Sequence, residues 1–170
     1  LEAYAHQYFH AGNFLDRREA VAFMYDIDNA KSEPGRKVLL AALSDTSFRI
    51  RSFAINAFTR LASDAVVINK AVEIAKKDPS RLARAAAIDY LGMQRSEILA
   101  DLFTNACYDS SYTVAGSALR ALTDIDSTAG KKMTVLLNKQ PSKGRLNATL
   151  IENSIRFGDA SSYDFIMSSF

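Results

Sequence analysis

Residues 45–58 read DTSFRIRSFAINAF, and this stretch decides the fold because the chain repeats its pattern twice more. The second copy is DPSRLARAAAIDYL at 78–91, and the third is DSSYTVAGSALRAL at 109–122. Counted from the aspartate that opens each copy, positions +9, +10 and +13 are apolar in all three. A repeat of about 32 residues is typical of stacked helix pairs. The pattern therefore predicts an all-α chain built as an α-α superhelix, a right-handed solenoid of antiparallel helix pairs.

The apolar pattern extends from these copies into further helices joined by short loops. We expect lead-in helices over 1–30, the second beginning near Asp16, with turn residues at 28–35, and repeats of the HEAT or armadillo type over 31–170. The helix pairs are predicted at about 34–44 with 47–62, 64–77 with 79–92, 95–108 with 110–123 and 129–139 with 143–157, and 160–170 begins a fifth. Asp45, Asp78 and Asp109 are expected to be N-caps of the second helices, and Pro79 to be the first residue of its helix.

Position +6 after the opening aspartate is Arg51 in the first copy, Arg84 in the second and Ala115 in the third. In HEAT-like repeats such an aspartate and arginine stack along neighbouring repeats as a buried ladder. An isolated buried charge would be costly, so the two residue types must pair. We therefore predict a structural ladder of Asp45, Arg51, Asp78 and Arg84, which ends at the third repeat because alanine cannot take part.

Composition excludes several classes of protein. The formal net charge of +2 is too small to indicate binding to nucleic acid or to an anionic membrane. No apolar run approaches the roughly 18 residues that a membrane span needs. The single cysteine, Cys107, excludes an internal disulfide framework, and its place on an apolar helix face predicts a buried, inert thiol.

A helical array could still grip DNA on a basic concave face, which positions +7, +8 and +11 of the second helices would line. These positions are Ser52, Phe53 and Asn56, then Ala85, Ala86 and Asp89, then Gly116, Ser117 and Arg120. The surface is mixed and lacks the lysine and arginine stripe that phosphates require. Asn56, Asp89 and Arg120 remain candidates for contacting a peptide or a neighbouring domain.

His6 and His10 have the i, i+4 spacing that can bind zinc from one helical face. A metallopeptidase would need a glutamate general base after the first histidine, and Gln7 cannot accept a proton. The gluzincin pattern also requires a glutamate where this chain has Asn29. We therefore expect packed interface histidines, and no catalytic residue or metal ligand in this chain. Two carboxylate pairs lie at turns, where helix capping explains them: Asp26 with Asp28, and Asp124 with Asp126.

Two stretches resemble bacterial M1-family (gluzincin) zinc aminopeptidases. YFHAGNFLDRREAV at 8–21 resembles the junction that enters their C-terminal helical region, and LSDTSFRIRSFAI at 43–55 resembles the repeat that follows it. The resemblance covers 8–61, and the rest of the chain is only HEAT-like. It implies a non-catalytic C-terminal domain that packs on the catalytic domain and shapes access to the active-site cavity. Zinc would be held upstream of Leu1, and the family's catalytic residues match no position here.

Two functions therefore remain open, and the second is a HEAT-like scaffold or adaptor that binds a protein partner. An upstream Gly-x-Met-Glu-Asn-like segment together with His-Glu-x-x-His would establish the first. The expected partners are the upstream catalytic domain, with peptide substrate or another protein, and neither nucleic acid nor membrane. Since the chain opens at Leu1 inside an aromatic stretch, we expect a domain of a longer protein. Its docking surface is expected to include Tyr4, Tyr8, Phe9 and Phe14, which a helix this short cannot bury together.

Overall fold

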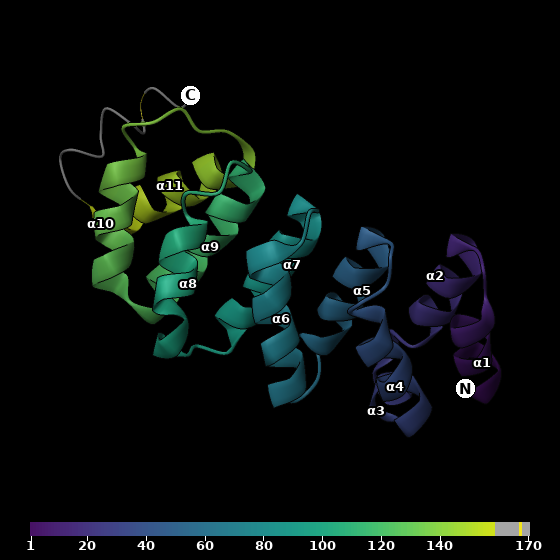
Figure 1. Ribbon diagram of the computed structural model, residues 1–170. Coiled ribbons are helices and arrows are strands. Elements are labelled where there is room, and N and C mark those ends of the chain that lie inside the picture. Colours follow the sequence, from purple (N-terminus) through teal and green to yellow (C-terminus); the bar gives the residue numbers. More distant parts are fainter. Residues whose placement is uncertain (159–166, 168–170) are drawn as a thin grey trace. The chain divides into compact units, whose positions relative to one another are not determined.

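A computed structural model describes residues 1–158 and residue 167, and this part of the chain is helical (Figure 1). It contains eleven α-helices and one short 3-10 helix, and the described residues form no strand. The predicted all-α class is thereby confirmed. The helix expected at 160–170 lies outside the described residues.

The chain divides into two compact units, the first comprising Leu1–Tyr90 and the second beginning at Leu91. The helices of the first unit are α1 (Glu2–His10), α2 (Phe14–Phe23), α3 (Ile27–Lys31), α4 (Glu33–Ala42), α5 (Phe48–Phe58), α6 (Ala65–Lys77) and most of α7 (Arg81–Met93). Helix α1 packs on α2 and α4, α2 packs on α4 and α5, and α5 packs on α4 and α6. The second helices α2 and α5 thus each contact their own partner and a helix of the next pair.

The apolar positions that define the repeat are the core of each unit. In all three copies the side chains at positions +9, +10 and +13 are at most 3% exposed. Replacing a buried leucine or isoleucine by alanine typically costs about 2–5 kcal/mol. Burial against neighbouring helices therefore explains why these positions recur.

Two starts of helices differ from the sequence prediction. Helix α2, expected to begin near Asp16, begins at Phe14, because the Asn13 side chain caps it by accepting a hydrogen bond from the Asp16 amide at 2.9 Å. The segment 28–35, predicted as a turn, contains α3 and the start of α4. The Asp26 carboxylate accepts from two amides of α3, and Ser32 caps α4 by accepting from the Gly35 amide at 3.1 Å. Polar capping residues this close together allow two short helices where turn residues alone suggested a loop.

The repeated aspartates are not N-caps. Their carboxylates instead accept from the amides of Ser47, Ser80 and Ser111, two residues further on, at 2.7, 2.8 and 2.8 Å. This is the local turn that aspartate side chains favour. It places Ser47 at the N-cap of α5 and Ser111 at the N-cap of α9 (Tyr112–Ile125). Helix α7 begins at Arg81, so Pro79 lies in the preceding loop rather than at the first helical position.

The second unit is organised around α9. Its other elements are the 3-10 helix η1 (Glu97–Leu99), α8 (Ala100–Ala106), α10 (Ser127–Leu137) and α11 (Gly144–Phe157). Helices α8, α10 and α11 all pack on α9. Glycines permit the close crossings: a Cβ at Gly116 would lie 2.7 Å from the carbonyl carbon of Arg145, and one at Gly130 would lie 2.6 Å from the Cα of Thr123.

A buried polar network joins the three long helices of this unit. The Asn153 amide nitrogen on α11 donates to the hydroxyl oxygens of Thr123 on α9, at 2.9 Å, and Thr134 on α10, at 3.0 Å. Both threonines donate in turn to main-chain carbonyls within their own helices at 2.8 Å. Because all three side chains are buried and bonded, the network specifies how these helices meet.

Candidate functional site

In the first unit, two buried aspartates each accept hydrogen bonds from an arginine of the preceding helix pair, and we call each of these arginine–aspartate contacts a rung. In the first rung, Arg17 on α2 donates from Nε and Nη2 to the two carboxylate oxygens of Asp45, at 2.8 and 3.2 Å. The Tyr8 hydroxyl on α1 also donates to Asp45, at 3.2 Å. The side chain of Asp45 is only 3% exposed. A bidentate pair with an added phenol is a strong way to hold a buried carboxylate.

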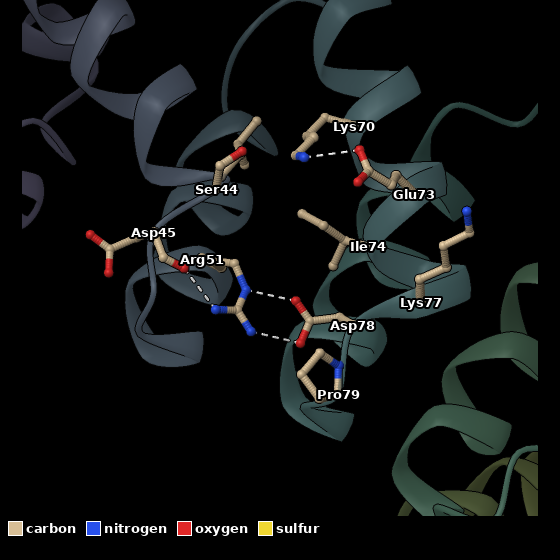
Figure 2. A pocket seen from close by; sticks show the side chains of 10 residues that line it. Ser44, Asp45, Arg51, Lys70, Glu73, Ile74, Lys77, Asp78 and Pro79 are labelled. Atoms are coloured by element: carbon tan, nitrogen blue, oxygen red, sulfur yellow. Dashed lines mark hydrogen bonds and ion pairs between the residues drawn. The ribbon is translucent and has the colours of Figure 1, made fainter.

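The second rung repeats this geometry one helix pair further on. Arg51 on α5 donates from Nε and Nη2 to the carboxylate oxygens of Asp78, at 2.6 and 2.7 Å. Its Nη1 donates to the main-chain oxygen of Asp45 at 2.7 Å. Figure 2 shows Arg51 between the turn at Asp45 and the carboxylate of Asp78. One guanidinium therefore ties its own turn to the turn of the next pair.

Arg84 bonds to the turn of its own helix pair in the same way as Arg51. Its Nη1 donates to the main-chain oxygen of Asp78 at 2.8 Å, as Nη1 of Arg51 does to that of Asp45. The structure thus brings Asp45, Arg51, Asp78 and Arg84 together along one line of turns, with the Asp78 carboxylate held by Arg51. Ala115, at the equivalent position in the second unit, is buried and offers no donor.

The two rung carboxylates are held in the ionised state. Burial alone would raise the pKa of Asp45, but the hydrogen bonds from Arg17 and the Ser47 amide outweigh it, and the pKa lies below its ordinary value. The pKa of Asp78 is likewise lowered, since the bonds from Arg51 and the Ser80 amide exceed the effect of burial. A carboxylate this well supplied with donors is a poor general base at neutral pH.

A hollow of about 310 Å³ opens beside the second rung. Ile74, on α6, lies in its wall together with the rung, and Lys70 donates to Glu73 there at 2.9 Å (Figure 2). Lys77, the last residue of α6, also belongs to the lining. The lining carries three basic and three acidic side chains, so it has no charge preference for a ligand of either sign.

The three residues predicted to contact a peptide or a neighbouring domain divide between the two units. Asn56 on α5 and Asp89 on α7 are exposed in the first unit. Arg120 is exposed on α9 in the second unit, where it forms an ion pair with Glu152 on α11 at 3.0 Å. All three side chains are therefore accessible to a partner.

The two histidines expected to be packed are exposed instead. Their rings stack at 4.0 Å between centroids, and Nδ1 of His10 lies 2.9 Å from the main-chain oxygen of His6. In the part of the chain that the structure describes, no group of three or more His, Cys, Asp or Glu side chains is placed to hold a metal ion. The rings remain in solvent because α1 buries only Ala5 and Tyr8.

The remaining candidates for chemistry are Cys107, which is buried, and the carboxylates at turns, of which Asp26, Asp124 and Asp126 cap a helix or form an ion pair. Burial raises the pKa of the Cys107 thiol to about 12, which agrees with the inert thiol expected from the sequence. Asp26 caps α3 and Asp126 caps α10, through hydrogen bonds to main-chain amides. Asp124 lies 3.6 Å from Arg156, in an exposed pair.

Sequence reasoning missed Arg17 and Tyr8 as partners of Asp45. Arg17 lies 34 residues before Arg51, so the repeat period pointed to it. The aspartate that opens each repeat lies six residues before the arginine, however, and the residue six positions before Arg17 is Ala11. A search for the aspartate therefore does not find the repeat that contains Arg17. Tyr8, expected on a docking surface, is instead 7% exposed, whereas its neighbour Phe9 is 45% exposed.

Among the described residues, no helix has both the length and the apolar character required to cross a membrane. A scan against models of protein families and a search among curated proteins found no match to this chain.

Proposed function

We propose that this chain is a HEAT-like solenoid domain without a catalytic role, which packs on the catalytic domain of an M1-type zinc aminopeptidase and shapes access to its cavity. The observation that carries the proposal is the pair of equivalent rungs, Arg17 with Asp45 and Arg51 with Asp78. Repeating units that each bond to the next are the construction principle of solenoids. Both carboxylates use their acceptor capacity within the chain, which supports a structural rather than a chemical role.

The aminopeptidase part of the proposal draws on the two stretches that resemble that family. Tyr8 and Arg17 belong to the first stretch, and Asp45 belongs to the second. Both side chains of the first stretch bond to the aspartate of the second. Residues of the two stretches that carry the resemblance are thus bonded to one another. This supports treating the two stretches as one structural unit rather than as separate coincidences of sequence.

The proposal is tested first by the sequence that precedes Leu1 in the parent gene. A His-Glu-x-x-His segment there, preceded by a Gly-x-Met-Glu-Asn-like segment, is the expected finding. The second test is kinetic. Deleting 31–170 from the full-length enzyme should lower its stability and change how kcat/KM depends on peptide length, because the wall of the cavity is lost. Arg51→Ala in the full-length enzyme is a milder companion that loosens the wall without removing it.

Unchanged stability together with an unchanged length dependence would refute the role at the cavity. The scaffold function would then be preferred, and one observation already favours it: Phe53 on α5 is 37% exposed, and Arg49 and Arg60, four residues before it and seven after it, are exposed as well. Aromatic and arginine side chains are enriched in protein interfaces. An upstream region without a zinc motif would point to the same conclusion.

A further inference from the structure

The exposed face of α5 and of the turn after it carries a stripe of four residues, Arg49, Phe53, Asn56 and Arg60, which we call the α5 stripe. Arg49, Phe53 and Asn56 are four and three residues apart and therefore lie on one side of α5, and Arg60 follows in the turn after the helix. All four are exposed. Arg49 and Arg60 are eleven residues apart, which corresponds to about 16 Å along a helix axis.

The aromatic centre of the α5 stripe is held in position from one side. The ring of Tyr25 lies 4.7 Å from that of Phe53, centroid to centroid. The guanidinium carbon of Arg60 lies 5.2 Å from the Tyr25 ring centroid, and its Nη1 donates to the Tyr25 carbonyl at 3.2 Å. These contacts order Phe53 and Arg60 before any partner binds, which lowers the entropy cost of binding.

The charge of the α5 stripe is not neutralised locally. Between Asp45 and Asp64 the sequence contains no acidic residue, and Arg51, the third arginine there, is paired with Asp78. Among the described residues, neither Arg49 nor Arg60 pairs with a carboxylate: the contacts of Arg49 are to the Phe48 ring and those of Arg60 are to Tyr25. Two exposed cations therefore flank an exposed aromatic ring.

We propose that the α5 stripe binds an acidic segment of a partner protein, with an apolar side chain on Phe53 and one carboxylate on each of Arg49 and Arg60. Arginine suits this role because its guanidinium can hold a carboxylate through two parallel hydrogen bonds. An extended segment rises about 3.3 Å per residue and presents every second side chain on the same face, so its two carboxylates would lie about four residues apart. The inference deepens the scaffold function, the second candidate above, and rests on it, by stating the chemistry of the partner.

The charge pattern favours protein over nucleic acid. A protein that holds nucleic acid mainly through the phosphates contacts about 6–10 of them with lysine and arginine side chains, whereas this surface offers two cations. Asn56, between them, supplies an amide that can bond to the main chain of an extended segment. Nucleic acid binding is therefore an outcome of the test and not part of the proposal.

The test uses the full chain and a fluorescein-labelled ten-residue peptide with two glutamates four positions apart and a leucine midway between them, so that all three side chains share one face of an extended peptide. Fluorescence anisotropy should show saturable binding that weakens with salt. Arg49→Glu, Arg60→Glu and Phe53→Ala should each raise Kd at least tenfold. Lys76→Glu, the same charge change on α6, should leave Kd within twofold. Arg49→Gln and Arg60→Gln, checked by circular dichroism, provide milder variants in case a charge reversal disturbs folding.

Equal affinity for a peptide with glutamine in place of both glutamates would overturn the proposal. So would an unchanged Kd in all the stripe variants, or a ten-nucleotide single strand that displaces the peptide and binds more tightly. The peptide assay and the kinetics of the full-length enzyme lacking 31–170 are independent measurements, so a failure to bind the peptide does not affect the kinetic test. Failure of the α5 stripe and failure of the proposed function are therefore distinguishable.

Discussion

Replacing Arg51 by alanine tests whether the rungs hold successive helix pairs together. The substitution removes two hydrogen bonds of 2.6 and 2.7 Å from the Asp78 carboxylate and leaves the Ser80 amide, at 2.8 Å, as a donor. Hydrogen bonds to charged groups contribute about 1.5–3 kcal/mol each, and breaking a buried ion pair costs about 3–5 kcal/mol. The Arg51 side chain is 12% exposed, so water can partly replace it. We therefore expect a loss of about 3 kcal/mol in the free energy of unfolding.

The measurement is urea unfolding of the full chain at pH 7, followed by far-ultraviolet circular dichroism, with hydrogen exchange read by mass spectrometry to locate the change in the first unit. Arg120→Ala is the matched control, because its ion pair with Glu152 leaves both side chains more than half exposed. An exposed pair of this kind contributes less than about 1 kcal/mol. A loss below about 1 kcal/mol for Arg51→Ala, equal to the control, would refute the reasoning.

Acid should remove the difference between wild type and Arg51→Ala. The pKa of Asp78 is lower in the folded chain than its ordinary value of 3.8, so folding favours the ionised carboxylate. That stabilisation is fully present above the ordinary pKa and is lost as the pH falls through the folded pKa. The gap in unfolding free energy should therefore be constant near neutral pH and shrink below about pH 4. A gap that widened in acid would contradict the assignment of the rung as an ion pair.

Two further predictions concern the second unit. Gly130→Ala should destabilise it by about 1–3 kcal/mol, because the new Cβ would meet the Thr123 main chain at 2.6 Å, whereas Gly12→Ala, with nothing within 4 Å, should be tolerated. Equal melting temperatures for these two variants would show that the α9–α10 crossing relaxes freely. Cys107 should react with a thiol reagent at pH 8 at least a hundredfold more slowly in the folded chain than in urea, since burial raises its pKa to about 12. Rapid labelling of the folded chain would contradict its burial.

The sequence by itself determined the helical class and most helix positions. Apolar residues at positions +9, +10 and +13 of each copy must face other helices, and this requirement is visible in a linear pattern. The fourth pair, predicted at 129–139 and 143–157, appears as α10 and α11 within two residues at each end. The ends of helices were harder to predict from the sequence. Helix α3 was missed because capping by Asp26 and Ser32 depends on side-chain geometry as well as residue type.

The partners of the ladder were decided only by tertiary structure. Arg17 and Asp45 are 28 residues apart, and Arg51 and Asp78 are 27 apart, so no local rule joins them. The aspartate motif suggested which residue types would pair, but the carboxylate of Asp78 could have been met from either neighbouring repeat. Packing of α2 and α6 on α5 brings each arginine to the aspartate of the following pair. The same packing neutralises Arg51 while leaving Arg49, two residues earlier, in solvent, because residues two apart on a helix point in different directions.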